Sequence, residues 1–310
     1  MVSASTNGLQ PPRARTFGIG EAVERLRAEF PDVSISSLRF LEREGLLGPR
    51  RTAGGHRLFS EEDLERVRLI KRQQQQHRSL AEIRELLARR DRLGTPAELA
   101  DRFVDAIAAR DVRRAYDLID EAGRVGVSMR TICLEILTPA LVKIGDLWAR
   151  GELDVAHEHL ASAVVRDLLS ALRAYQLPVR PNGRVAVAAC AAHERHELGL
   201  RMVAALLEQE GWTVHFLGAD TPLASTLQMV ADNQADLLLI SVGEPSSRAF
   251  VEAVAHEIAS WSPSKRPKLV IGGRAAAEAA AGLPVDFVAT SAEHLLAWPE
   301  LRASRRPQPS

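Results

Sequence analysis

The hydrophobic and polar positions of the first third of the chain predict short amphipathic helices around a tight turn. Apolar residues recur at three- and four-residue steps over Phe17–Phe30, and Pro31 ends this predicted helix. A second short helix follows, capped by Ser34 or Ser36 and stopped by Gly45. Two short helices joined in this way are typical of a helix-turn-helix module.

The middle of the chain keeps the helical period. Thr95 can cap a helix and Pro96 suits its first turn. Apolar residues follow an amphipathic period in four stretches, Pro96–Ala109, Val112–Ala122, Met129–Ala149 and Val155–Leu172. Four helices with short links predict a four-helix bundle. On this pattern alone the bundle is equally a passive dimerisation element.

In the last third the pattern changes to short apolar runs that alternate with amphipathic helices. The runs, which have the composition of buried strands, are Val185–Ala189, Val214–Leu217, Leu237–Ser241, Leu269–Ile271 and Phe287–Ala289. Helices are expected between them, for example over Glu197–Glu210 and Leu223–Asp232. This order predicts a parallel, doubly wound sheet that binds ligands beyond the carboxyl ends of its strands.

Length supports a multidomain interpretation, because 310 residues are enough for two or three cores. We expect a winged helix-turn-helix over 1–92, a four-helix bundle cap over 93–176 and a Rossmann-like α/β domain over 183–303. The segment Leu177–Gly183 has the composition of a linker.

Composition favours a cytoplasmic protein. No apolar run approaches the roughly 20 residues that span a bilayer, so no membrane partner is expected. The segment Met1–Pro12 has no apolar signal core. The two cysteines, Cys133 and Cys190, lie far apart and fit core packing in a reducing compartment.

Charge is balanced overall but concentrated locally. The segment 1–92 holds 18 Lys and Arg against 13 Asp and Glu, although the whole chain has a net charge of zero. This modest excess favours a polyanion such as double-stranded DNA. The candidate DNA-binding residues lie on the second short helix and on the basic, glycine-tipped loop that follows it: Arg39, Arg43, Arg50, Arg51, His56 and Arg57.

The order of these pieces, from Leu38–Leu47 through the basic loop to Ser60–Leu64, resembles the MerR family of transcription regulators. The resemblance covers about Thr16–Ala88 and implies binding to operator DNA. The turn before Ser34 is longer than usual, and Phe40-Leu41 stands where many members have two tyrosines. No cysteine-rich segment follows, which argues against the metal sensing of some members.

A Glu-x-His-x-x-Gly motif follows the first predicted strand of the α/β segment, at Glu194, His196 and Gly199. A neutral imidazole suits cobalt, and a nearby carboxylate can fix its orientation. With Ser241 and Gly272-Gly273 at the ends of later strands, the motif resembles cobalamin-binding domains that ligate cobalt through a histidine. The resemblance implies His196 as the lower axial ligand and a displaced benzimidazole near Ser241, with room left by the glycine pair. Asp220 and Thr221, after the second strand, join this candidate site.

The bundle carries a second motif, in which Trp148 is followed after nine residues by Glu158 and His159. This spacing resembles the helical cap of cobalamin-dependent sensors. It implies that the indole packs on the upper ligand of the cofactor and that Glu158 and His159 bond its ribose or adenine. In light-sensing members a histidine directly follows the tryptophan, whereas this chain has Ala149.

Over nearly its whole length the chain is similar to the cobalamin-dependent photoreceptor repressors of the CarH/LitR group. The resemblance implies adenosylcobalamin (alternatively methylcobalamin), a homotetramer on operator DNA in the dark, and release by light. Two alternatives stay open: a light-independent cobalamin-binding regulator, favoured by Ala149, and a corrinoid-carrier enzyme module, which gives the basic residues no role. We expect no enzyme activity.

Overall fold

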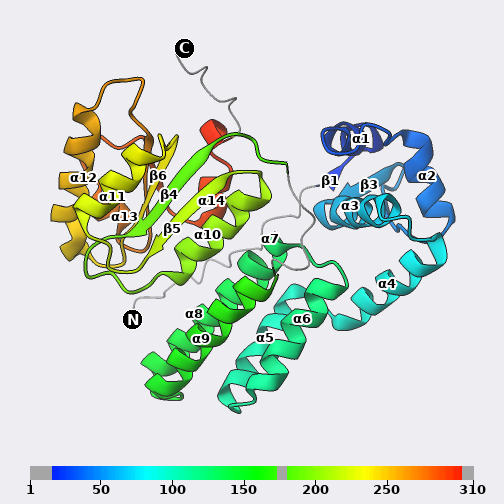
Figure 1. The fold of residues 1–310 in the computed structure, drawn as a ribbon. Coiled ribbons are helices and arrows are strands. Elements are labelled where there is room, and N and C mark those ends of the chain that lie inside the picture. The colour runs from blue at the N-terminus through cyan, green and yellow to red at the C-terminus, as the bar shows by residue number, and fades with distance from the viewer. Residues whose placement is uncertain (1–15, 173–179, 302–310) are drawn as a thin grey trace, which may run out of the picture. The chain divides into compact units, whose positions relative to one another are not determined.

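The structure, a computed structural model, describes residues 16–172 and 180–301. Contacts divide the chain into two units between Leu93 and Gly94. The first unit contains the helix-turn-helix segment, and the second contains the helical segment together with the α/β segment (Figure 1). The boundary predicted between the second and third domains lies inside the second unit, and most of the predicted linker lies outside the described residues.

The first unit is a helix-turn-helix with a small antiparallel sheet. Its helices are α1 (Ile19–Arg27), α2 (Ile35–Arg43), α3 (Glu61–Gln75) and α4 (Leu80–Leu93), and its strands are β1 (Thr16–Phe17), β2 (Arg50–Arg51) and β3 (Arg57–Ser60). The strand order is β1-β3-β2. The first helix is shorter than predicted because Phe17 pairs with Phe59 in the sheet, which leaves the helix to begin at Ile19.

Local capping explains where α2 and α3 begin. Ser34, one of the two predicted caps, accepts a hydrogen bond from the Ser37 N–H, and the Ser37 hydroxyl lies against the Ser34 N–H in return. Ser60 and Asp63 form the same reciprocal box at the start of α3. A cap of this type contributes about 1 kcal/mol to stability.

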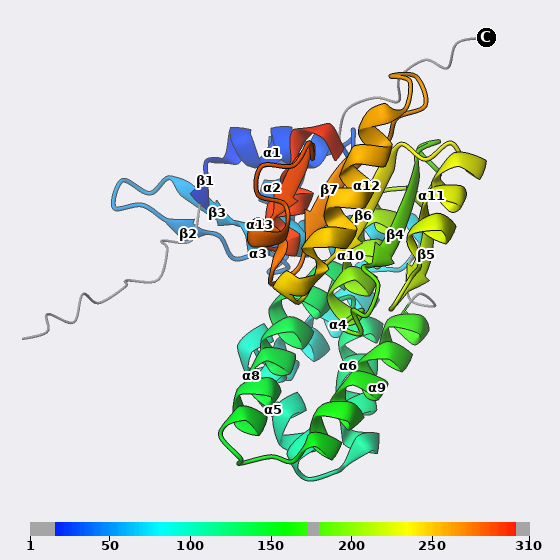
Figure 2. The ribbon, with the colours of Figure 1, turned by 90° about the vertical axis from the view of Figure 1, so that its left-hand side faces the viewer.

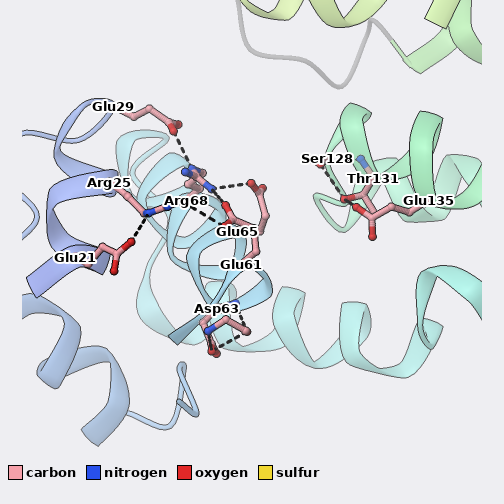
Figure 3. A network of polar contacts seen from close by, with 11 residues as sticks. Glu21, Arg25, Glu29, Glu61, Asp63, Glu65, Arg68, Ser128, Thr131 and Glu135 are labelled. Carbon is pink, nitrogen blue, oxygen red and sulfur yellow. Dashed lines mark hydrogen bonds and ion pairs between the residues drawn. The ribbon is translucent and has the colours of Figure 1, made fainter. Parts of the chain in front are cut away.

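A charge network fastens α3 to the end of α1 (Figure 3). Arg68 pairs with Glu29 at 2.8 Å and with Glu65 at 2.8 Å, and it lies 3.6 Å from Glu61. Burial lowers the pKa of Arg68, but the surrounding carboxylates outweigh burial and raise it. Figure 3 shows these carboxylates gathered around one guanidinium. A shared network holds the helices more firmly than isolated surface pairs do.

The helical segment of the second unit forms the predicted bundle, with one irregular helix. Its elements are α5 (Pro96–Ala108), α6 (Val112–Arg124), α7 (Met129–Thr131), a π-helical segment (Ile132–Leu137), α8 (Thr138–Ala149) and α9 (Val155–Leu172). The stretch predicted as one helix over Met129–Ala149 therefore contains a π-turn. Pro139 accounts for it, because proline lacks an N–H and its ring crowds the preceding turn.

The α/β segment is a five-stranded parallel sheet. Its strands are β4 (Val185–Cys190), β5 (Thr213–Gly218), β6 (Leu237–Ser241), β7 (Lys268–Gly272) and β8 (Phe287–Ala289), in the order β5-β4-β6-β7-β8. The connections carry α10 (Leu198–Gln209), α11 (Leu223–Asp232), α12 (Arg248–Ser260), α13 (Ala276–Ala279) and α14 (Ala292–Leu296), with short 3-10 turns at Pro245–Ser247 and Pro299–Leu301.

Helices cover both faces of this sheet, as the two views show (Figures 1 and 2). Alternate residues of the strands face α11, α12 and α13 on one side, where Val187, Ile240 and Ile271 are buried. The other residues face α10 and α14, where Ala188, Leu239 and Val270 are buried. The predicted doubly wound architecture is confirmed, and the strand order reverses between β4 and β6, which is where such sheets bind ligands.

No helix in the described ranges is long and apolar enough to cross a membrane.

We predict that both cysteines resist modification in the folded protein. Burial raises the pKa of Cys133 to about 12, and burial with the nearby Glu194 and Glu197 carboxylates raises the pKa of Cys190 to about 12. Since the thiolate is the reactive form, labelling near neutral pH should be at least about a thousandfold slower than for a free thiol. A colorimetric thiol assay checks this: it should detect both thiols in denaturant and neither in the native protein.

Candidate functional site

The centre of the site is the buried carboxylate of Glu194, in the loop that joins β4 to α10. Its side chain is 2% exposed. Oε1 accepts a hydrogen bond from the His196 N–H at 2.8 Å and lies 2.6 Å from His196 Nδ1. Oε2 accepts a hydrogen bond from the Gly243 N–H in the loop after β6. One carboxylate therefore connects the two loops that flank the point where the strand order reverses.

This contact decides which nitrogen His196 presents. Burial raises the pKa of Glu194, but hydrogen bonds from His196 and from the Gly243 N–H outweigh burial and leave the pKa below its usual value. The carboxylate is therefore ionised at neutral pH, and Nδ1 of His196 carries the proton that faces it. The side chain of His196 is 72% exposed, so Nε2 and its lone pair are available to a ligand.

Gly243 has a structural role that the sequence did not reveal. In the structure, a Cβ at this position would overlap Oε2 of Glu194. The missing side chain is thus the space that the carboxylate occupies. The position two residues after Ser241 must be glycine as long as Glu194 points this way.

A row of small residues crosses the carboxyl end of the sheet beside this loop. Cys190 pairs in register with Ser241, Ser241 with Gly272, and Gly272 with Ala289. Strand alternation places all four on the side of α10 and α14. Cys190 and Ala289 at the two ends of the row are buried, whereas Ser241 and Gly272 between them are partly exposed, and their roles beside a ring stay predictions.

Gly273 also has a structural role. Its φ is +103°, in the left-handed region that favours glycine, and a Cβ there would overlap the backbone of Val242. Its place beside a ligand ring stays a prediction. The glycine is required by the turn after β7 and by its close approach to the loop after β6.

The other predicted residues of the α/β segment differ in what they offer. Gly199 is exposed on α10, and a Cβ there would meet no atom within 4 Å. Asp220 shapes the loops: its carboxylate accepts a hydrogen bond from the His193 N–H at 2.7 Å, and its own N–H donates to the Glu194 backbone carbonyl at 2.9 Å. Thr221 is 7% exposed and donates its hydroxyl to the Gly218 carbonyl. Asp220 and Thr221 thus stabilise the loops after β4 and β5, whereas the surface of α10 at Gly199 is open.

The cap residues lie together at one end of two helices in contact, α8 and α9. Trp148 is 49% exposed in the last turn of α8. Glu158 and His159 stand in the first turns of α9, with His159 Nδ1 at 2.7 Å from Glu158 Oε2. The neighbouring His157 is buried, and its Nδ1 lies 2.7 Å from the carboxylate of Asp154, so this pair stabilises the start of α9.

Side-chain contacts from α8 and α9 join the cap to the α/β segment. The Thr138 hydroxyl at the start of α8 contacts the Met202 sulfur on α10 at 3.5 Å. Nε of Arg166 on α9 donates to the carboxylate of Glu197 at 3.1 Å, and Glu197 is the residue directly after His196. Sequence reasoning missed Arg166 and Glu197, because their partnership depends on tertiary contact.

These features fit a large planar cofactor that takes one axial nitrogen from the protein. An imidazole of fixed orientation presents Nε2, a row of small residues lies beside it, and an exposed indole stands on the cap. A corrin brings its own equatorial nitrogens, so His196 is the one protein ligand it would need from below. In the described part of the chain, no three or more His, Cys, Asp or Glu side chains form a metal site of their own.

The candidate DNA surface belongs to the first unit. Arg39 and Arg43 are exposed on α2 and Arg50 on β2, and none of the three has a side-chain partner among the described residues. Arg51 and Arg57, by contrast, each lie 2.6 Å from an oxygen of Glu42. Glu42 therefore anchors the strands of the wing to α2.

The wing itself is a short hairpin. Its strands pair through Arg50 with Leu58 and Arg51 with Arg57. At the tip, the Thr52 N–H donates to the His56 carbonyl, and the His56 N–H donates to the Thr52 hydroxyl. His56 is exposed at this tip. Hydrogen bonds from Arg57, and then from Arg51, hold the pKa of Glu42 below its usual value against the opposing effect of desolvation. Glu42 is an organising residue that the sequence analysis did not single out.

We predict opposite stability effects for two glycine substitutions around His196. Gly243→Ala places a methyl group where the Glu194 carboxylate lies and should destabilise the protein by about 1–3 kcal/mol. Gly199→Ala enters open space in the first turn of α10 and should stabilise the protein by about 0.4–1 kcal/mol, because alanine restricts the unfolded chain. Urea unfolding of both variants without cofactor checks the signs. Equal stability of Gly243→Ala and the wild type would contradict the carboxylate clamp.

Comparison with known protein families matches three segments. Residues 19–90 match the MerR HTH family regulatory protein model, and residues 99–173 and 184–297 match two B12 binding domain models. Among solved structures, the Methanosarcina barkeri monomethylamine corrinoid protein shares the fold of part of this chain. Its TM-score is 0.56 at 18% identity, over 67% of this chain and 99% of that one.

Two repressors of Myxococcus xanthus are similar over most of their length. The HTH-type transcriptional repressor CarA is 30% identical over 91% of this chain and 98% of its own. The HTH-type transcriptional repressor CarH is 30% identical over 84% of this chain and 90% of its own. An uncharacterised HTH-type transcriptional regulator of Mycobacterium tuberculosis is 29% identical over 84% of this chain and 94% of its own. The chain belongs to the MerR-type transcriptional repressors with B12-binding domains, the family of CarA and CarH.

Proposed function

We propose that the protein is a repressor that holds adenosylcobalamin in the dark, occupies operator DNA as a homotetramer, and leaves the DNA on illumination. The observation that carries this proposal is the exposed Nε2 of His196, which Glu194 holds in one orientation below a cap that presents Trp148. Membership of a family of B12-binding repressors supports it. As a regulator of transcription, the protein would act in the cytoplasm, where the operator lies.

The residues below the cofactor would bind and orient it. His196 would take the lower axial position, with Glu194 fixing its tautomer and keeping its Nε2 basic. The benzimidazole, displaced from the metal, would lie along the row that contains Ser241 and Gly272. Gly199 would let the nucleotide tail pass close to α10.

The residues above would select the upper ligand. Trp148 is exposed enough to stack on an adenine, and an aromatic stack adds about 0.5–1.5 kcal/mol beyond burial. Glu158 and His159 would bond the polar atoms of the ribose or the base. These contacts favour the adenosyl form over methylcobalamin, which offers them nothing to bind. The bound cofactor would supply a cobalt–carbon bond that visible light breaks.

Mass action would convert cofactor binding into DNA binding. A ligand that binds only the assembled state stabilises that state. Four DNA-binding units held together gain avidity for an operator that each binds weakly. Loss of the upper ligand would remove this stabilisation and release the DNA.

One observation favours a second candidate, a cobalamin-binding repressor that does not respond to light. Ala149, which follows Trp148, has no atom that can bind a metal. A corrinoid carrier of the kind named in Methanosarcina, such as dimethylamine corrinoid protein 3 at 23% identity over 58% of this chain, matches less of it. A carrier role would also leave the exposed Arg39, Arg43 and Arg50 without a purpose. We therefore propose no catalysed reaction.

We predict that illumination lowers the mass of the loaded protein. Protein loaded with adenosylcobalamin in the dark should elute from size-exclusion chromatography with the mass of a tetramer, and after green light with a smaller mass. Light scattering on the eluting peak gives the measurement. His196→Ala, the control, should show a different absorption spectrum with the cofactor and no difference in mass between dark and light.

Two outcomes separate the alternatives. Unchanged mass after light, with normal binding of the cofactor, would remove the light response and leave the light-independent regulator. A wild-type spectrum in His196→Ala would refute the lower ligation itself.

We also predict that Arg50 contacts a DNA phosphate. It is exposed and has no partner among the described residues, so Arg50→Ala should leave folding unchanged. The slope of log affinity against log salt should become shallower by about 1, because one fewer counterion is released. Fluorescence anisotropy with promoter DNA over a salt series gives the slope. Lys265→Ala removes the same charge from the second unit and should keep the wild-type slope.

A further inference from the structure

The first unit exposes one large apolar side chain among its described residues, that of Ile35 in the first turn of α2. Ile35 is 40% exposed, whereas the other large apolar residues described in this unit are buried or only partly exposed. A single exposed apolar residue is common on protein surfaces, so its neighbours decide whether it has a use. Here the neighbours are candidate DNA-binding arginines.

The turn of α2 puts Ile35 on the same face as two of these arginines. Ile35, Arg39 and Arg43 follow one another at four-residue steps, and all three residues are exposed. The side of the helix that faces the core carries Leu38 and Leu41, which are buried. The outward face of α2 is therefore basic along most of its length and apolar at its amino-terminal end.

Local contacts fix the direction of this first turn. Ser34, rather than Ser36, caps α2, so Ile35 is the first residue of the helix and not part of the preceding turn. Val33 before the cap and Leu38 after it are both buried in the same core, which is the pattern of a hydrophobic staple. Because isoleucine is branched at Cβ and has few rotamers, its side chain needs little ordering when it binds a partner.

An apolar side chain finds few partners on DNA. Phosphate and sugar oxygens, and the donors and acceptors of the bases, form no hydrogen bond with an alkyl group. The second helix of a helix-turn-helix lies in the major groove, with its amino-terminal residues at the base edges. In that groove, the apolar group at a base-pair edge is the C5-methyl of thymine. The place and the chemistry of Ile35 therefore favour one base.

We propose that Ile35 contacts the C5-methyl group of a thymine in the operator and so selects a T·A pair at that position. This inference rests on the proposed binding of operator DNA through α2. The contact removes two apolar groups from water and makes no bond to the base. Cytosine lacks the methyl group and presents an amino donor in the groove instead, so a C·G pair loses the contact.

The face of α2 then divides recognition between two kinds of residue. Arg39 and Arg43 carry charge, which draws the helix toward any DNA sequence. Ile35 carries none and gains only where a thymine methyl group meets it. Because copies of this chain in a homotetramer would bind related half-sites, the selected thymine should recur once in each half-site.

The test compares thymine with uracil, which lacks only the C5-methyl group. Full-length protein loaded with adenosylcobalamin in the dark is added to labelled promoter duplexes in which one thymine at a time is replaced by deoxyuridine, and fluorescence anisotropy gives the affinity. The wild type should bind about fourfold more weakly when the contacted thymine is replaced, the factor expected for one methyl group. Ile35→Ala should bind the thymine and uracil duplexes equally.

Two further variants are controls. Ile35→Val keeps a branched alkyl group at this position and should respond to uracil more strongly than Ile35→Ala does. Val142→Ala shortens an exposed branched residue of α8 in the second unit and should respond as the wild type does. The scan with wild-type protein needs no variant, so the proposal stays testable even if Ile35→Ala does not fold.

The outcomes separate this inference from the proposed function. Normal binding of the wild type to promoter DNA, with no thymine whose replacement weakens it, would overturn the inference and leave the proposed function in place. An equal response of Ile35→Ala and the wild type at every thymine would do the same. Wild-type protein that shows no salt-sensitive binding to promoter DNA would overturn the proposed function and this inference with it.

Discussion

The site depends on one buried carboxylate. Glu194 bonds the backbone and the imidazole of His196 with one oxygen and the Gly243 N–H with the other. A buried charge is costly unless it is paired, and here three donors satisfy it. Those donors come from the loops after β4 and after β6. The carboxylate therefore connects the two loops at the point where the strand order reverses, and it also fixes the direction of the imidazole. Both contacts require glycine at position 243, because a Cβ there would overlap the carboxylate.

The helical bundle and the α/β segment share one compact unit, and two of their contacts lie close to the loop that holds His196. Arg166 reaches Glu197, the residue after His196, and Thr138 reaches Met202 on α10. These contacts connect the bundle to the α/β segment beside His196. Residues 99–173 also match a B12 binding domain model, which argues against a purely passive dimerisation element.

In the first unit a carboxylate again organises basic residues. Glu42 on α2 takes Arg51 and Arg57 from the two strands of the wing, at 2.6 Å each. These pairs orient the hairpin and leave Arg39, Arg43 and Arg50 exposed without partners in the described residues. The predicted DNA-binding set thus contains two kinds of arginine: those that position the wing, and those that are free to meet phosphate or base edges.

The sequence by itself determined the elements and their chemistry, because period, caps and motifs are local. Strands β6 and β8 and helix α11 begin and end where the apolar runs do, Ser34 and Ser60 cap the helices they precede, and His196 lies two residues from its carboxylate. Only the tertiary structure decided what depends on distant partners. Gly243 makes room for Glu194, Gly273 serves a turn against Val242, and Pro139 turns a predicted straight helix into a π-segment. The pairing of Arg166 with Glu197 and of Glu42 with the wing joins residues far apart in the chain. No spacing along a sequence encodes such contacts, since they exist only once the chain has packed.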